Sequence, residues 1–158
     1  MSSWREFPER PIVGVGGVVI ESERVLLILR GNEPLKGQWS IPGGTLELGE
    51  TLVEGTAREL TEETGLQVRV MEMIEVFERI NFGHGADETW TTIEERRRPR
   101  FHFVIVDFLC QRISGEAMAG GDVTDVAWAD EDDLEKFALS PTATRVIRKA
   151  FSMARARK

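Results

Sequence analysis

The chain has 158 residues, of which 41% are hydrophobic and 30% charged, and its formal net charge is −7. This length and apolar content predict one domain, residues 1–158, with a hydrophobic core, and give no indication of disorder. The negative charge argues against a general nucleic-acid-binding protein, because that mode of binding needs a basic surface that neutralises phosphates.

The ends and the cysteine content indicate where the protein works. The N-terminal residues MSSWREFPER lack the apolar segment of a signal peptide, and no apolar run reaches the roughly 18 residues of a membrane span. We therefore expect a cytoplasmic protein with no membrane association. The single cysteine, Cys110, lies in the apolar run FHFVIVDFLC, so we expect it to pack in the core. The sequence leaves open whether the chain forms a homodimer.

The first predicted elements are two β-strands, in residues 12–20 and 24–30. Both are rich in aliphatic and β-branched residues, and Glu-Ser-Glu between them suggests a tight turn. A polar loop follows, and then WSIPGG, in which Pro42, Gly43 and Gly44 favour a second turn. A functional group could lie at that turn.

A helix is predicted for residues 51–64. Thr51 and Glu54 have the spacing of a capping box, and Gly65 is a residue type that ends helices in the left-handed conformation. The helix should pack through a stripe formed by Val53, Ala57 and Leu60.

Glu59, Glu62 and Glu63 lie on the side of this helix away from that stripe, within reach of one another. Two such charges about 4 Å apart repel by roughly 4 kcal/mol at an effective dielectric constant of about 20. A divalent cation such as Mg²⁺ or Mn²⁺ would compensate this repulsion, and carboxylate oxygens suit such hard ions. The alternative is a solvated acidic face without a ligand.

The middle of the chain contains two further strands, in residues 67–80 and 101–111. The second is strongly apolar, as a central strand would be. The polar segment between them, residues 81–100, is long for a plain connection. We expect a substrate-facing loop there, which could include a hairpin.

The C-terminal part should contain a short strand in residues 125–129, a short acidic helix in residues 130–136 and a longer helix that begins at Ser140 and Pro141. The last helix should be buried along one stripe, formed by Val146, Ile147, Ala150, Phe151 and Ala154.

The helix and the turn before it form one pattern with fixed spacing. Gly44 is followed after five residues by Glu50, and after seven more by Arg58-Glu59-Leu60-Thr61-Glu62-Glu63-Thr64-Gly65-Leu66. Across residues 44–66 this pattern resembles the signature of the Nudix hydrolases at every fixed position. The resemblance implies an α/β fold, an α/β/α sandwich built on a mixed β-sheet, in which a loop–helix–loop holds a divalent ion beside a diphosphate.

The resemblance also implies roles for individual residues. Glu62 and Glu63 would bind the metal, together with the carbonyl of Gly43, and Glu59 would bind metal or act as the catalytic base. Glu50 would pair with Arg58 and fix the loop against the helix, which is a structural role.

A further acidic ligand often comes from a segment well after the signature in this family. Asp122, in GGDVTDVAW, is our candidate, with Asp125 and Glu116 as weaker ones. The alternative for Asp122 is a solvated loop aspartate.

Two residue types could contact the substrate. Arg30, at the end of the second predicted strand, could bind a phosphate, and Trp90 or Phe82 could stack on a base. The alternatives are a solvated strand-end arginine and exposed loop aromatics.

These features predict an enzyme whose partner is a nucleotide-derived small molecule and whose cofactor is Mg²⁺ or Mn²⁺. The resemblance extends from VGVGGVVI to FHFVIVDFLC, where it is to small bacterial ADP-ribose pyrophosphatase-like members. It implies cleavage of a nucleoside diphosphate linked to another group, with ADP-ribose as the leading substrate, to a nucleoside monophosphate and a phosphorylated product. The alternatives are a nucleoside triphosphate pyrophosphohydrolase and a non-catalytic nucleotide-binding sensor.

Overall fold

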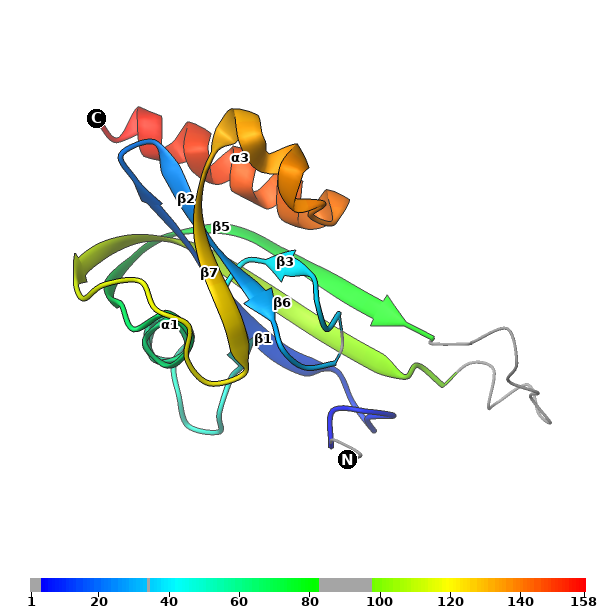
Figure 1. The fold of residues 1–158 in the computed structure, drawn as a ribbon. Helices are drawn as coiled ribbons and strands as arrows, with labels where there is room; N and C mark the ends of the chain where they lie inside the picture. Colours follow the sequence, from blue (N-terminus) through cyan, green and yellow to red (C-terminus); the bar gives the residue numbers. More distant parts are fainter. Residues whose placement is uncertain (1–3, 34, 83–97) are drawn as a thin grey trace.

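The computed structural model describes residues 4–33, 35–82 and 98–158 (Figure 1). The strands and helices occur in the order β1 (Ile12–Glu21), β2 (Arg24–Arg30), β3 (Trp39–Ser40), β4 (Gly43–Thr45), α1 (Leu52–Thr64), β5 (Gln67–Asn81), β6 (Phe101–Ser114), β7 (Val123–Asp130), the 3-10 helix η1 (Glu131–Phe137) and α3 (Pro141–Ala156).

The strands form a mixed sheet in the order β3-β2-β1-β6-β5, with β4 paired to β1 and β7 paired to β2. The central pair, β1 and β6, is parallel, and the other pairs are antiparallel. Since β1 and β6 lie far apart in the sequence, their pairing brings the N-terminal and middle parts of the chain together. The predicted mixed sheet is confirmed.

Helices cover the sheet on both sides, with α1 on one face and α3 on the other (Figure 1). Successive residues of a strand point to opposite faces. Val18 therefore packs in the core beneath α3 with Ile147 and Phe151, whereas Val19 packs in the core beneath α1 with Leu60. This is the layered arrangement expected from the sequence.

The ends of α1 match the prediction. Thr51 and Glu54 exchange the two hydrogen bonds of a capping box, and Gly65 ends the helix at φ 74°, donating its N–H to the carbonyl of Thr61. The predicted packing stripe is wrong in part, because Val53 is 49% exposed. The buried residues of the helix are Gly55, Thr56, Leu60 and Thr64.

Close approach between α1 and β1 explains this packing. A Cβ atom on Gly17 of β1 would lie 2.7 Å from a Leu60 methyl group, so the helix sits directly on the strand backbone. Small residues favour such close contact. The buried face of α1 is made largely of small and polar residues, so a search for a hydrophobic stripe could not identify it.

Other predictions differ in detail. The segment after β7 is a 3-10 helix that starts one residue later than the acidic helix expected at 130–136. Strand β5 extends beyond its predicted end to Asn81, and strand β6 extends beyond its predicted end to Ser114. Asn81 and Phe101 still pair where the two strands meet the segment between them. Most of the expected loop at 81–100 lies outside the described residues.

Cys110 is buried at 2% exposure, as expected. No helix in the described parts of the chain is both long and apolar enough to span a bilayer.

Candidate active site

The glycine turn before α1 lies directly against the backbone of β1. Gly43 in β4 pairs with Gly16 in β1, and a Cβ atom on Gly43 would lie 2.2 Å from the carbonyl oxygen of Val15. Only glycine fits at this distance. This close fit against β1 fixes the main chain of the turn next to α1.

Two glutamates of α1 contact this turn. The N–H of Gly43 donates a 2.7 Å hydrogen bond to Oε1 of Glu63. The carboxyl group of Glu59 lies over Gly44, where an added Cβ atom would come within 2.4 Å of its carboxyl carbon. The absence of side chains at the turn thus makes room for the carboxylates.

Arg58 connects the helix to the loop that precedes it. Its Nε and Nη2 donate to the two carboxylate oxygens of Glu50 at 2.5 and 2.9 Å, and Nη2 also donates to the carbonyl of Thr45 at 3.1 Å. Its Nη1 donates to Glu59 at 2.8 Å and to Glu62 at 3.3 Å. One guanidinium group therefore fixes the loop and orients two of the three signature glutamates.

The electrostatic surroundings differ strongly among these carboxyl groups. Burial raises the pKa of Glu63 to about 7; the Gly43 N–H opposes this shift and the charge of Glu59 adds to it. Burial also raises the pKa of Glu59, against the effect of Arg58. The hydrogen bonds from Arg58 instead lower the pKa of Glu50 to about 2. Glu50 is thus a firmly ionised partner of Arg58, whereas burial makes the ionised forms of Glu59 and Glu63 less favourable.

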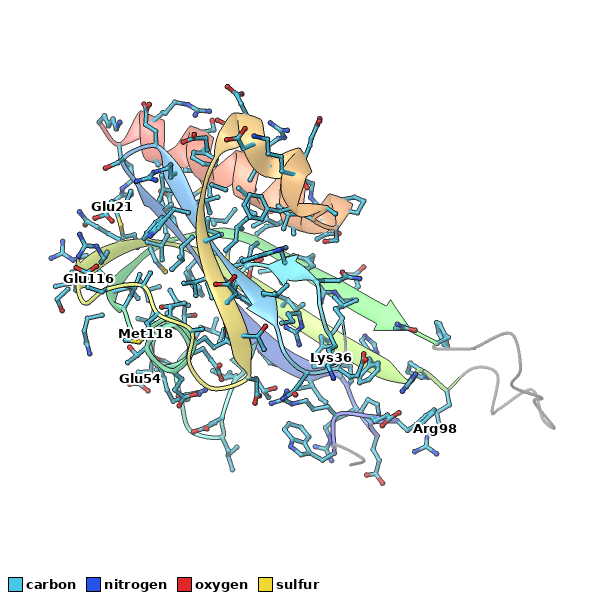
Figure 2. All side chains as sticks on the ribbon, in the orientation of Figure 1. Glu21, Lys36, Glu54, Arg98, Glu116 and Met118 are labelled. Atoms are coloured by element: carbon cyan, nitrogen blue, oxygen red, sulfur yellow. The ribbon has the colours of Figure 1, made fainter. Side chains whose placement is uncertain are left out.

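The loop before β7 is tied to the end of α1. The N–H of Met118, a residue labelled in Figure 2, donates to the carbonyl of Thr64 at 2.9 Å, and the N–H of Gly120 donates to the carbonyl of Glu63 at 3.1 Å. Asp122 follows in the same loop and is exposed, and its charge contributes to the raised pKa of Glu63. The structure therefore brings Asp122 near the signature glutamates.

The remaining predicted site residues have different positions. Asp125 accepts a hydrogen bond from the N–H of Val126. Arg30 is half-buried, and the charge of Glu63 opposes the lowering of its pKa by burial, so the two lie near each other. Phe82 is 42% exposed at the edge of the described region. Trp90 lies outside the described residues.

Comparison with known proteins identifies the family to which this fold and this signature belong. The NUDIX domain family profile matches residues 10–150, which is most of the chain. The chain belongs to the Nudix hydrolases.

Individual relatives support this assignment. This Nudix hydrolase is 34% identical to an ADP-ribose pyrophosphatase from Methanocaldococcus jannaschii, over 82% of the chain and 68% of that protein. It is 30% identical to a MutT-like protein from Streptomyces ambofaciens, over 93% of the chain and 83% of that protein. Its fold matches a MutT Nudix hydrolase from Burkholderia pseudomallei with a TM-score of 0.73 and 25% identity, covering 89% of the chain and 98% of that structure.

The donor groups of the signature suit a hard divalent cation. Glu59 and Glu63 are half-buried carboxylates with raised pKa values, and a nearby cation would reverse that shift and favour the ionised forms. Within residues 4–33, 35–82 and 98–158, however, no three His, Cys, Asp or Glu side chains are grouped closely enough to hold a metal ion. The Glu62 side chain is 55% exposed and accepts a hydrogen bond from Arg58.

Two charged residues near the Nudix signature were missed by sequence reasoning. Asp107 is only 3% exposed, and Arg79 is half-buried on the neighbouring strand β5. One signal for Asp107 was available in the sequence, because it is the sole charged residue in the apolar run FVIVDFLC. A charged residue inside a buried strand favours a specific role over solvation. Arg79, in a strand with several exposed polar residues, gave no such signal.

Proposed function

We propose that this Nudix hydrolase is a Mg²⁺- or Mn²⁺-dependent pyrophosphohydrolase, and that its preferred substrate is ADP-ribose or a similar nucleoside diphosphate derivative. The observation that supports this best is the contact of Glu59 and Glu63 with the glycine turn, with Arg58 orienting Glu59 from the side. This arrangement gathers carboxylates at a turn whose lack of side chains makes room for them.

The proposed metal site includes the three signature glutamates and two further oxygen donors, the Gly43 carbonyl and Asp122. A divalent ion bound there would neutralise charge on the phosphate oxygens and make the attacking water more acidic. Water then attacks one phosphorus atom, the P–O–P bridge breaks, and the products are a nucleoside monophosphate and a phosphorylated partner.

The residues of this chain have separate tasks in that reaction. Glu59, which accepts a hydrogen bond from Arg58, would bind the metal or accept the proton of the attacking water. Glu50 keeps Arg58 in place through two hydrogen bonds, so the carboxylates remain oriented when the substrate binds. Arg30, near Glu63, would contact a phosphate group of the substrate.

ADP-ribose is preferred because the relative that is 34% identical over 82% of the chain is an ADP-ribose pyrophosphatase. The test is a panel of ADP-ribose, sugar nucleotides and nucleoside triphosphates, each incubated with the protein with and without Mg²⁺. We expect metal-dependent release of AMP, fastest from ADP-ribose.

The control is Glu63→Gln, which should lose release from all substrates. Faster release of pyrophosphate from a triphosphate would instead support the triphosphate pyrophosphohydrolase. Binding of nucleotides without any turnover would support a sensor.

A further inference from the structure

A cavity lies between the C-terminal end of α3 and the sheet, beside the turn that joins β1 to β2 (Figure 1). Its volume is about 380 Å³, which is within the range of sites that bind small molecules in proteins. Residues of β5 and β6 complete its wall. The cavity is thus on the side of the sheet that α3 covers, whereas the signature glutamates belong to α1 on the other side (Figure 1).

The floor of this cavity is apolar. Leu109 and Phe151 belong to the buried core beneath α3, and Ile20 and Ala154 are partly buried against that core. Met71 also lines the cavity, and its flexible side chain can adapt to the shape of a bound molecule. The floor therefore suits the apolar part of a ligand, which would be removed from water there.

The rim of the cavity carries an excess of positive charge. Among the described residues that line it, Arg155, Arg157 and Lys158 are cations, and Glu23 is an anion. We call the three cations the cationic rim. The protein as a whole has a net charge of −7, so this local excess is opposite in sign to the overall charge. A ligand that complements the rim carries a negative charge.

Exposed ion pairs hold the arginines of the rim. Arg157 donates to Glu72 at 3.2 Å and Arg155 donates to Glu131 at 2.9 Å, and the two arginine side chains are 46% and 54% exposed. Such exposed pairs contribute little to stability, so the acid group of a ligand can compete with either glutamate. Cations at the end of a helix also interact favourably with the helix dipole. The dipole, however, gives no reason for an apolar cavity beside them.

We propose that this cavity binds an amphipathic carboxylate, a small organic anion whose apolar body lies against Leu109 and Phe151 and whose acid group meets the cationic rim. Both parts of the ligand contribute to binding, because the floor removes the body from water and the rim donates hydrogen bonds to the carboxylate. This site is separate from the signature carboxylates, and it does not depend on the proposed function.

Amide NMR titrations of the isotope-labelled full chain test this site without nucleotide or metal. Octanoate has both parts of the expected ligand, octanol has the same chain without the charge, and acetate has the charge without the chain. Octanoate should cause saturable shifts of amides in residues 20–23, 109–111 and 151–158. Octanol should bind at least about threefold more weakly, and acetate should cause no saturable shifts.

Two kinds of variant separate the rim from the floor. Arg157→Gln removes one rim cation and should weaken octanoate binding about threefold or more, while leaving octanol binding unchanged. The matched control is Arg148→Gln on the same helix, because Arg148 is similarly exposed, at 49%, and lies outside the cavity lining. It should bind octanoate as the wild type does. Ala154→Phe places a ring in the cavity and should weaken the binding of both octanoate and octanol.

The proposal is overturned by an absence of saturation with millimolar octanoate, or by shifts centred on residues outside the cavity. Equal affinity for octanoate and octanol would also overturn it, because the cationic rim would then have no role. So would equal losses of octanoate binding in Arg157→Gln and Arg148→Gln. Thermal unfolding checks that each variant is folded. If Ala154→Phe does not fold, the two arginine variants still decide the outcome.

Discussion

The N–H of Gly43 donates a 2.7 Å hydrogen bond to the carboxylate of Glu63, and this bond joins the glycine turn to the last turn of α1. The contact fixes the distance between the main chain of the turn and the half-buried carboxylate of Glu63. Since Arg58 holds Glu59 and Glu62 from the other side, a substrate would meet carboxylates whose orientation is already set.

The first prediction concerns Glu62. Glu62→Gln should lower kcat by at least about a hundredfold, because it removes a charge from the proposed metal site, and should leave the Tm nearly unchanged, because the side chain is 55% exposed. The matched control is Glu54→Gln on the same helix, which keeps a capping-box residue type and removes a charge that favours the helix N-terminus. It should lower the Tm only slightly and leave kcat unchanged. A fully active Glu62→Gln enzyme would reject the metal assignment.

Metal binding should stabilise the folded protein. Millimolar Mg²⁺ or Mn²⁺ bound at the proposed site should favour the folded state, so the Tm in a thermal unfolding scan should rise with metal concentration. The increase should be smaller in Glu63→Gln. A Tm independent of both metals would contradict a site formed by the signature glutamates.

Acid should destabilise the protein through Glu50. Its hydrogen bonds from Arg58 lower the folded-state pKa from 4.5 to about 2, so its stabilising effect is present above pH 4.5 and is lost as the pH falls through that range. Arg58→Met should lower the Tm at neutral pH and flatten this acid loss, as measured by unfolding at a series of pH values. An unchanged acid dependence in the variant would show that another group dominates.

Asp107 should produce the opposite pH dependence. Burial raises its pKa from 3.8 to about 7, so the folded state keeps this proton longer than the unfolded state, and stability falls as the pH rises through that interval. Asp107→Asn removes the titration. The Tm of the variant minus that of the wild type should therefore increase from pH 4 to pH 8. A difference that stays constant with pH would contradict the burial of an ionisable Asp107.

Gly17 tests the close packing of α1 on β1. Gly17→Ala places a methyl group 2.7 Å from Leu60 and 2.9 Å from the sulfur of Cys110, both of which are buried. We expect a loss of about 1 to 3 kcal/mol in the free energy of unfolding, measured with urea. Gly49→Ala is a poor control because of its positive φ, whereas Gly14→Ala meets its nearest atom at an ordinary 3.5 Å and should be milder.

Much of this architecture was predictable, and the reasons for the misses are physical. Local signals predicted α1, because its capping box and its left-handed glycine act within one turn of the chain. The pairing of β1 with β6 depends on residues about 90 positions apart, and no local pattern specifies it. Arg79 was missed for the same reason, since its proximity to Asp107 exists only once the sheet has formed.

Glu63 takes part in two contacts at once: its carboxylate accepts from Gly43, and its main-chain carbonyl accepts from Gly120. The amide of Gly120 is therefore a reporter for the loop that presents Asp122. Deuterium would replace this amide hydrogen only when that loop detaches from α1, so the exchange rate at Gly120 measures how often the loop and the helix separate.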